Sequence, residues 1–323
     1  MAIPIILDCD PGHDDAVAML LALASPQLEV LGVTTVGGNA TLEHVTENAL
    51  RLLALAGRED VPVAAGARHP LVGPLRTAPH VHGESGIEGP ALPPARSEAL
   101  PEDAMTFIAR TLEDAGERVT LVPTGPLTNI GLLLRERPDL KPRIAHICLM
   151  GGAAGEGNIT PAAEFNAWVD PEAADIVYRS GLPVTMMGLD VTHKALLWDA
   201  EREAMAAAGG PVTKLMCGLL GYFEGFHRRV YGWNGGPIHD AVAVAHLAHP
   251  GLVTTVRTNV VVELTGEFTR GRTVVDLHGV TGREPNAEVG VDIDRERFIG
   301  IVRDAFAAFD RPRHPPDTGS RTD

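Results

Sequence analysis

Short apolar segments alternate with helical patterns along most of this chain, and this alternation restricts its fold more than any other feature. Each apolar segment has the length and aliphatic content of a buried strand. The segments are Ile3–Leu7, Leu28–Val33, Val119–Val122, Ile144–Met150 and Val184–Met187. The clearest helical patterns cover residues 14–24, 42–56 and 101–116. We therefore predict an α/β fold, with an open, mostly parallel, Rossmann-like sheet flanked by helices.

The last third of the chain has a different pattern. Residues 254–264 and 273–277 predict a β-hairpin or edge strands, so we expect extra C-terminal strands beside the sheet. No linker divides the chain, which predicts a single domain over residues 1–310. Residues 311–323 are rich in Pro, Arg and small polar residues and are predicted to form a disordered tail. Residues 68–100 are rich in Pro and Gly, as is typical of a lid or a binding loop.

The composition argues against several classes of function. The chain has 42 acidic and 27 basic residues and a net charge of −15, so it should repel nucleic acid. Its three cysteines lack the spacing of a zinc site or a disulfide framework. The first residues lack the basic group of a signal peptide, and the longest apolar run is too short to cross a membrane. We therefore expect a cytoplasmic protein with no nucleic acid or membrane partner.

Gly-containing turns with a polar residue follow several of the predicted strands. They lie at residues 10–12, 37–39, 124–126, 151–158 and 188–190. The carboxyl ends of parallel strands meet at one edge of the sheet, where ligands bind in open α/β folds. These turns are therefore expected to surround one cavity.

Four carboxylates lie close together where the first strand ends and the first helix begins: Asp8, Asp10, Asp14 and Asp15. A helix dipole stabilises each acid by only about 0.3 to 1 kcal/mol, which is too little for the whole set. A cation is the stronger explanation, and carboxylate oxygens favour Ca²⁺ or Mg²⁺ over zinc or copper. The alternative is that Asp14 caps the helix and the other acids are solvated.

The segment Asp8-Cys-Asp-Pro-Gly-His-Asp-Asp15 resembles the D-x-D-P-G-x-D-D signature of the inosine-uridine preferring nucleoside hydrolase family. Segments similar to other blocks of this family follow in order: His82–Gly86, Thr124–Asn129, Gly157-Asn158, Ala163–Asn166, Asp170–Ala173, His239-Asp240 and Gly266–Gly271. The resemblance runs from about Ile3 to Phe309 and implies the nucleoside hydrolase fold.

By this resemblance, the cofactor is Ca²⁺, held by Asp10, Asp15, the backbone carbonyl of Thr124, and Asp240. Calcium takes about six to eight oxygen ligands, which leaves room for two sugar hydroxyls and one water. A site that binds the ion in this way would select ribose over 2′-deoxyribose.

The resemblance also assigns residues to the sugar. Asp14 would accept a hydrogen bond from the 2′-hydroxyl, and Asn166 would bind the 3′ side. Asn158 and Glu164 would hold the 5′-hydroxyl, and the carboxylate there would repel a 5′-phosphate, so the substrate would be a nucleoside. Phe165 and Asn39 are further substrate-binding candidates at the same site.

The implied reaction is hydrolysis of the N-glycosidic bond of purine or pyrimidine ribonucleosides by direct attack of a metal-bound water. Asp10 would take the proton of this water, and His239 would protonate the leaving base, since imidazole titrates near neutrality. Locally, His239-Asp240 is explained as well by Asp240 capping a helix over residues 240–249.

The aromatic segment 222–233 holds the candidates for contact with the base. Tyr231 and Trp233, in a Gly-rich stretch, are candidates to cover the base. Tyr222, Phe223 and Phe226 have helical spacing and favour core or subunit contacts instead. The resemblance implies a homodimer or homotetramer, whereas the base preference is not predicted.

His82 is a secondary candidate for substrate binding, and His13 lies close to the acidic cluster in sequence. A single loop histidine is more often a surface group, and this alternative stays open for both. Two other functions compete with the nucleoside hydrolase. A Mg²⁺ phosphohydrolase of the haloacid-dehalogenase type also begins with D-x-D, but Pro11-Gly12 follows here and the chain has three lysines. A ribose-binding sensor would lack Asp10 or His239, and both are present.

Overall fold

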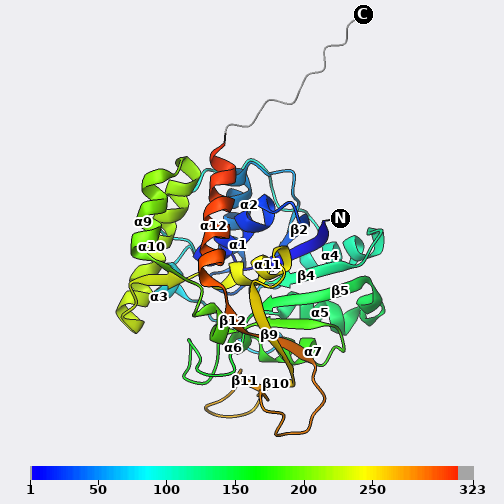
Figure 1. Cartoon of the computed structure of the whole chain (residues 1–323). Helices are drawn as coiled ribbons and strands as arrows, with labels where there is room; N and C mark the ends of the chain where they lie inside the picture. The colour runs from blue at the N-terminus through cyan, green and yellow to red at the C-terminus, as the bar shows by residue number, and fades with distance from the viewer. Residues whose placement is uncertain (1, 312–323) are drawn as a thin grey trace, which may run out of the picture.

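The computed structural model describes residues 2–311, so most of the predicted tail lies outside the described residues. Its centre is a sheet of eight strands in the order β3-β2-β1-β4-β5-β6-β12-β9 (Figure 1). The strands predicted from the sequence form β1 (Ile3–Cys9), β2 (Leu28–Thr35), β4 (Val119–Pro123), β5 (Ile144–Met150) and β6 (Val184–Met187). The short strand β3 (Val63–Ala65) pairs with β2, and all these strands run parallel, as predicted.

Side chains of each central strand enter two separate cores, one on each face of the sheet. Ile5 and Leu7 lie in one core and Ile6 in the other, because neighbouring residues of a strand point to opposite faces. Both faces are buried, which explains the continuous apolar runs.

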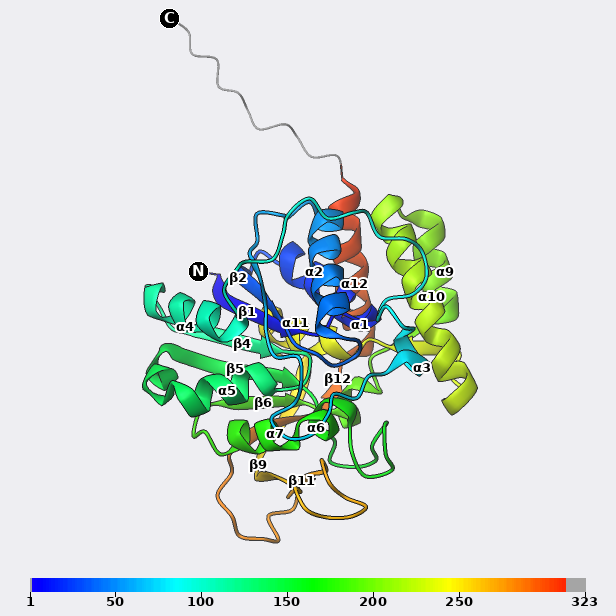
Figure 2. The same ribbon diagram turned by 180° about the vertical axis from the view of Figure 1, so that it is seen from behind.

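Helices cover both faces of the sheet. The first core is closed by α1 (His13–Ala24), α2 (Leu42–Ala56), α10 (Pro211–Tyr231), α11 (His239–Ala248) and α12 (Arg295–Asp310). The second core is closed by α4 (Ala104–Asp114), α5 (Thr128–Glu136) and α7 (Pro171–Tyr178). Figure 2 shows α2 and α12 on one side of the strands and α7 on the other. Among residues 2–311, no helix is long and apolar enough to span a membrane.

Extra C-terminal strands are present, as predicted, but they belong to two different sheets. β9 (Val253–Thr258) joins the edge of the main sheet, antiparallel to β12 (Ala287–Ile293). β10 (Val260–Val262) forms a separate antiparallel pair with β11 (Thr273–Val275). Strand β12 was not predicted, although its residues Ala-Glu-Val-Gly-Val-Asp-Ile alternate apolar and polar side chains around a glycine.

The remaining elements are short or lie beside α10. These are α3 (Pro79–His82), the 3-10 helix η1 (Pro138–Arg143), α6 (Phe165–Val169), α8 (Leu189–Thr192), α9 (Asp199–Ala208) and the antiparallel pair β7 (Leu196–Trp198) and β8 (Gly235–Pro237). The helix predicted at residues 101–116 is shorter, because Asp103 caps α4 through the backbone N–H of Thr106.

Candidate active site

A cavity that is partly open to solvent lies beyond the carboxyl ends of the central strands. The turns after β2, β4 and β5 contribute Asn39, Thr124 and Asn158, and the turn after β1 leads to Asp14. The turn at residues 188–190 does not line the cavity. Its Asp190 carboxylate instead accepts hydrogen bonds from the backbone N–H groups of Ala154 and Gly155, in the loop that leads to Asn158.

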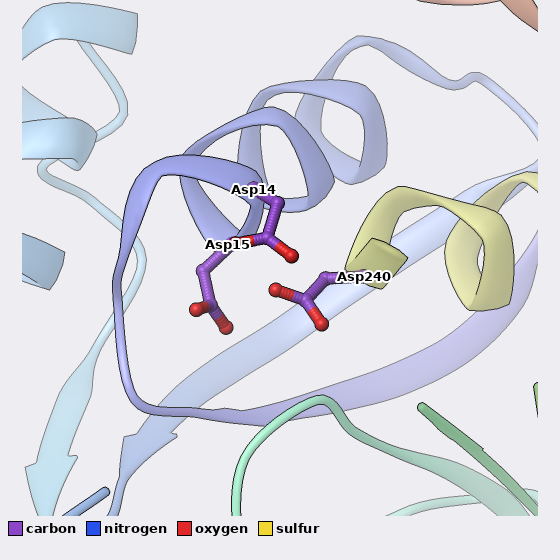
Figure 3. Close-up of side chains that lie close together, drawn as sticks. All are labelled: Asp14, Asp15 and Asp240. Carbon is purple, nitrogen blue, oxygen red and sulfur yellow. The ribbon is translucent and has the colours of Figure 1, made fainter. Parts of the chain in front are cut away.

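Three buried carboxylates converge at one end of this cavity. Asp14 and Asp15 come from the first turn of α1, and Asp240 comes from the first turn of α11. One oxygen of each lies within 4.8 Å of the other two, and Figure 3 shows Asp240 facing the two acids of α1. Two helices far apart in the sequence thus bring their first turns, which carry partial positive charge, to one point.

Asp10 lies beside this cluster and is not among the residues that line the cavity. Its Oδ2 accepts a hydrogen bond of 2.7 Å from the backbone N–H of Asn39, whereas its buried Oδ1 has no hydrogen-bond partner. Asp15 accepts hydrogen bonds from Gly12 N at 3.0 Å and from Thr124 Oγ1 at 2.8 Å. An unpartnered buried oxygen beside three carboxylates is the environment that a cation would complete.

The electrostatics of the cluster agree with this geometry. Burial, together with the neighbouring carboxylates, raises the pKa of Asp10, Asp14 and Asp240, and burial raises the pKa of Asp15. None of the ion pairs formed by residues 2–311 involves these acids. The donors are all oxygens, so the residues present fit a hard cation such as Ca²⁺.

Asp8 is not part of this carboxylate cluster and has hydrogen-bond partners of its own. Its Oδ1 accepts hydrogen bonds from Thr34 Oγ1 at 2.6 Å and from Asn129 Nδ2 at 2.7 Å. Burial raises the pKa of Asp8 to about 6. The alternative explanation of the acidic segment is wrong, because Asp8, Asp10 and Asp15 are 0% exposed and the N-cap of α1 is Gly12.

Two glycines make room for the carboxylate of Asp10. A Cβ built on Gly38 would overlap Oδ2 of Asp10, and one built on Gly125 would lie 2.7 Å from its Oδ1. Because Asp10 is fully buried, its carboxylate cannot swing into solvent to relieve such a contact.

Gly38→Ala is therefore expected to displace the Asp10 carboxylate and to lower kcat about 100-fold, the typical effect of a misplacement of about 1 Å. Steady-state release of reducing sugar measures this effect, with Gly300→Ala as the control because a Cβ there meets no atom within 4 Å. Equal activity of the two variants would show that the carboxylate of Asp10 does not need this position.

The side of the cavity assigned to the sugar is built around the start of α6. Glu164 caps this helix: its carboxylate accepts hydrogen bonds from the backbone N–H groups of Asn166, Ala167 and Gly152. Asn158 Oδ1 accepts a hydrogen bond from Phe165 N at 2.9 Å. Both side chains are therefore fixed by the backbone, with Glu164, Phe165 and Asn166 all at the cavity wall.

Asn166 also contacts the residue expected to offer a carbonyl to the ion. Its Nδ2 donates to the carbonyl oxygen of Thr124 at 2.7 Å and to that of Met150 at 3.2 Å. A carbonyl oxygen has two lone pairs, so Thr124 keeps one for a further partner.

The opposite wall comes mainly from α10, which contributes Phe223, Phe226, His227 and Tyr231. Phe223 is buried, as expected of a core residue, but the expectation did not include that Phe223 and Phe226 also line the cavity. Tyr231 lies at the cavity wall too, but as the last residue of α10 and not in a Gly-rich loop.

Trp233 was expected to cover the base, and the structure does not place it at the cavity wall. The chain turns at Gly232, whose φ of 69° ends α10 in the left-handed region. Trp233 then stacks on Tyr231, with 4.5 Å between ring centroids. Trp233 therefore packs against a residue of the cavity wall and does not line the cavity itself.

His13 and His82 are buried, so the alternative that they are surface groups is wrong for both. His82 lines the cavity, and its Nδ1 lies 3.0 Å from Nδ1 of His13, whose Nε2 lies 2.8 Å from the carbonyl oxygen of Glu88. His80, His193 and His227 also line the cavity and were not predicted from the sequence. His227 follows Phe223 by one helical turn, and this spacing could have revealed it.

His239 lies between the acidic cluster and the aromatic wall. It is the first residue of α11, and its Nδ1 lies 2.7 Å from Oγ1 of Thr192. Burial, with the neighbouring histidines, lowers the pKa of His239 well below the usual value for imidazole. The alternative in which Asp240 caps the helix is wrong, since the N-cap is Ile238.

The model of the inosine-uridine preferring nucleoside hydrolase family matches residues 5–300 of the chain. The chain is 49% identical over 310 residues to pyrimidine-specific ribonucleoside hydrolase RihA from Citrobacter koseri, covering 96% of this chain and 99% of that protein. It is 50% identical over 305 residues to a RihA from Escherichia coli, covering 94% of this chain and 98% of the relative.

Solved structures agree with the family match. The purine-preferring ribonucleoside hydrolase from Gardnerella vaginalis superposes with a TM-score of 0.88 at 34% identity, covering 95% of this chain and 99% of that one. A plant nucleoside hydrolase gives a TM-score of 0.89 at 31% identity, covering 95% of this chain and 100% of the other. These findings exclude the phosphohydrolase and the ribose sensor as explanations of the site. With its mostly parallel sheet and its acidic cavity, the chain belongs to the inosine-uridine preferring nucleoside hydrolase family and is a hydrolase of N-glycosyl bonds.

Proposed function

We propose that this protein is a Ca²⁺-dependent ribonucleoside hydrolase that prefers pyrimidine nucleosides and releases ribose and a free base. The observation that carries the proposal is that the two ends of one cavity differ in chemistry. Buried carboxylates lie at one end, and aromatic and histidine side chains lie at the other. A ribose can bind at the acidic end while its base lies against α10.

Asp10, Asp15, Asp240 and the carbonyl of Thr124 are the residues that would hold the ion. The chemistry that a bound Ca²⁺ supplies there is orientation of the ribose diol and of one water molecule, with acidification of that water. Asp14 lies within the carboxylate cluster and is 5% exposed at the cavity, so it can accept a hydrogen bond from a sugar hydroxyl.

The reaction needs a proton acceptor for the water and a hydrogen donor for the base. Asp10 takes a proton from the attacking water while the water oxygen bonds to C1′ of the ribose. The C1′–N bond breaks and its electron pair leaves with the base. The carboxylates of Asp10 and Asp14 stabilise the positive charge that develops on the sugar ring.

His239 is the hydrogen donor for the leaving base in this proposal. Its lowered pKa makes the protonated ring scarce in the free enzyme and a strong acid where it forms. The neutral ring can also donate a hydrogen bond that stabilises negative charge on the base, as neutral imidazole does in other enzymes.

The preference for pyrimidines is supported by sequence identity. The identity to the pyrimidine-specific RihA proteins is 49 to 50%, against 34% to the purine-preferring enzyme from Gardnerella vaginalis. Tyr231, His82 and the aromatic side chains of α10 are the surfaces that a base would meet. Assembly as a homodimer or homotetramer stays a prediction.

A substrate panel tests this function. Uridine and cytidine are expected to be cleaved with a higher kcat/KM than inosine and adenosine. 2′-Deoxyuridine is expected to be about 10⁴-fold poorer than uridine, because it lacks a hydroxyl that the site is built to bind. Ribose or deoxyribose release is measured by a reducing-sugar assay. Equal rates with uridine and 2′-deoxyuridine would contradict binding of the diol, and no release from any nucleoside would contradict the proposed function.

A further inference from the structure

We propose that Thr192 is a positioning residue for departure of the base: its hydroxyl holds the imidazole of His239 so that Nε2 always carries a hydrogen. This inference rests on the proposed function, because it concerns how His239 is prepared as a donor. Thr192 itself does not line the cavity and would act only through His239.

The backbone fixes these two side chains opposite each other. Thr192 is the last residue of α8, and His239 is the first residue of α11. A backbone hydrogen bond of 3.0 Å from Ile238 N to Ala195 O joins the two segments next to both residues. Thr192 Oγ1 then lies 2.7 Å from Nδ1 of His239, which is a short and well-formed contact.

The hydroxyl of Thr192 has one partner among the described residues, and this partner is His239. Elsewhere in the structure, Ser25 and Thr111 donate to the carbonyl oxygen four residues earlier in their helices. Thr192 makes no such bond, and it is 0% exposed, so bulk water does not reach it. Its hydrogen therefore has Nδ1 of His239 as its acceptor.

This arrangement fixes where the imidazole carries its hydrogen. When His239 is neutral, Thr192 donates to Nδ1, so the ring hydrogen must be on Nε2. When His239 is protonated, Nδ1 donates to Oγ1 and Nε2 again carries a hydrogen. A hydroxyl can change between donor and acceptor, whereas a carboxylate at this place would keep the hydrogen on Nδ1 and leave Nε2 bare.

His227 shows the opposite arrangement in the same cavity. Its Nδ1 lies 3.2 Å from the carbonyl oxygen of Phe223, and a carbonyl can only accept. The neutral ring of His227 therefore has a bare Nε2. The kind of partner on Nδ1 thus distinguishes a donor histidine from an acceptor histidine here.

The experiment compares Thr192→Val with Thr192→Ser on two substrates, uridine and 4-nitrophenyl β-D-ribofuranoside. The nitrophenolate leaves without protonation. We expect Thr192→Val to lower kcat for uridine about 10- to 100-fold with little change in KM, the usual effect of removing an orienting partner. We expect less than about a threefold effect on the nitrophenyl substrate, and activity near that of the wild type for Thr192→Ser, which keeps the hydroxyl.

Thr185→Val is the matched control. Thr185 Oγ1 bonds Nε2 of His146 at 2.8 Å, so the same substitution removes the same kind of contact away from the cavity. This variant should keep wild-type rates on both substrates. In addition, Thr192→Val should cause no further loss in a His239→Ala background, because the two side chains act as one unit.

Several results would overturn the inference. Wild-type rates for Thr192→Val, or an equal loss on both substrates, would leave Thr192 no role in positioning. If Thr192→Val does not fold, ¹⁵N chemical shifts of the His239 ring in the wild type decide, since a bare Nε2 in the neutral ring contradicts the proposal. A wild type that cleaves neither substrate would instead overturn the proposed function, and the inference with it.

Discussion

Asp10→Asn is expected to lower kcat for uridine by about 10³-fold while the protein stays folded, since removal of a general base costs about 10²- to 10⁴-fold. The amide is nearly the same size as the carboxylate and can still accept the hydrogen bond from Asn39 N. It cannot take a proton from water, and it offers a weaker ligand to a cation. Initial rates of ribose release measure the effect, and a thermal melt confirms the fold.

The control for this variant is Asp103→Asn. Asp103 caps α4 far from the cavity, and Asn is as good an N-cap as Asp. The control should therefore keep wild-type activity. If Asp10→Asn turns over uridine at a near-normal rate, then Asp10 is not the base, and another group takes the proton.

Removal of the ion is expected to have an even larger effect. A protein stripped with a calcium chelator should lose ribose release by more than about 10³-fold, because water activation and diol orientation are lost together. Added Ca²⁺ should restore the rate, and Mg²⁺ should restore less of it, since Mg²⁺ demands a tighter octahedral geometry. Calcium titration with and without chelator, followed by initial rates, measures this dependence.

The same stripping should lower stability. Without a cation, the buried carboxylates of Asp14, Asp15 and Asp240 face one another with no compensating charge. A ligand at 100 times its Kd contributes about 2.7 kcal/mol to the free energy of unfolding, so Tm should rise measurably when Ca²⁺ is added back. Full activity and an unchanged Tm in protein shown to be free of metal would contradict the calcium site.

Most of the sheet could be predicted from the sequence, and one strand shows why the rest could not. The central strands are buried on both faces, so their apolar runs are visible directly. β12 lies next to the edge strand and carries Glu288 and Asp292 among its apolar residues. Its residues alternate apolar and polar side chains as in a half-buried strand, a local pattern that the prediction overlooked, whereas its place between β6 and β9 is set by long-range pairing.

The candidate site, like the sheet, could be predicted from the sequence only in part. Asp10, Asp14 and Asp15 lie within one short segment, so their charge repulsion alone indicated a cation. Asp240 shows no such local signal, and only the family resemblance connected it with them. His193 and His227 reach the cavity through the packing of α8 and α10, and of the two only His227 had a local signal, its helical spacing from Phe223. Trp233 was predicted to cover the base, but it follows the turn at Gly232, which was not predicted, and does not line the cavity.

The wall against which the base would lie has a consequence for how enzymes of this kind diversify. Four of its side chains come from one helix, α10, whereas the acidic end comes from α1 and α11. Substitutions on a single surface of α10 can therefore change which base is accepted while the chemistry at the sugar is left intact.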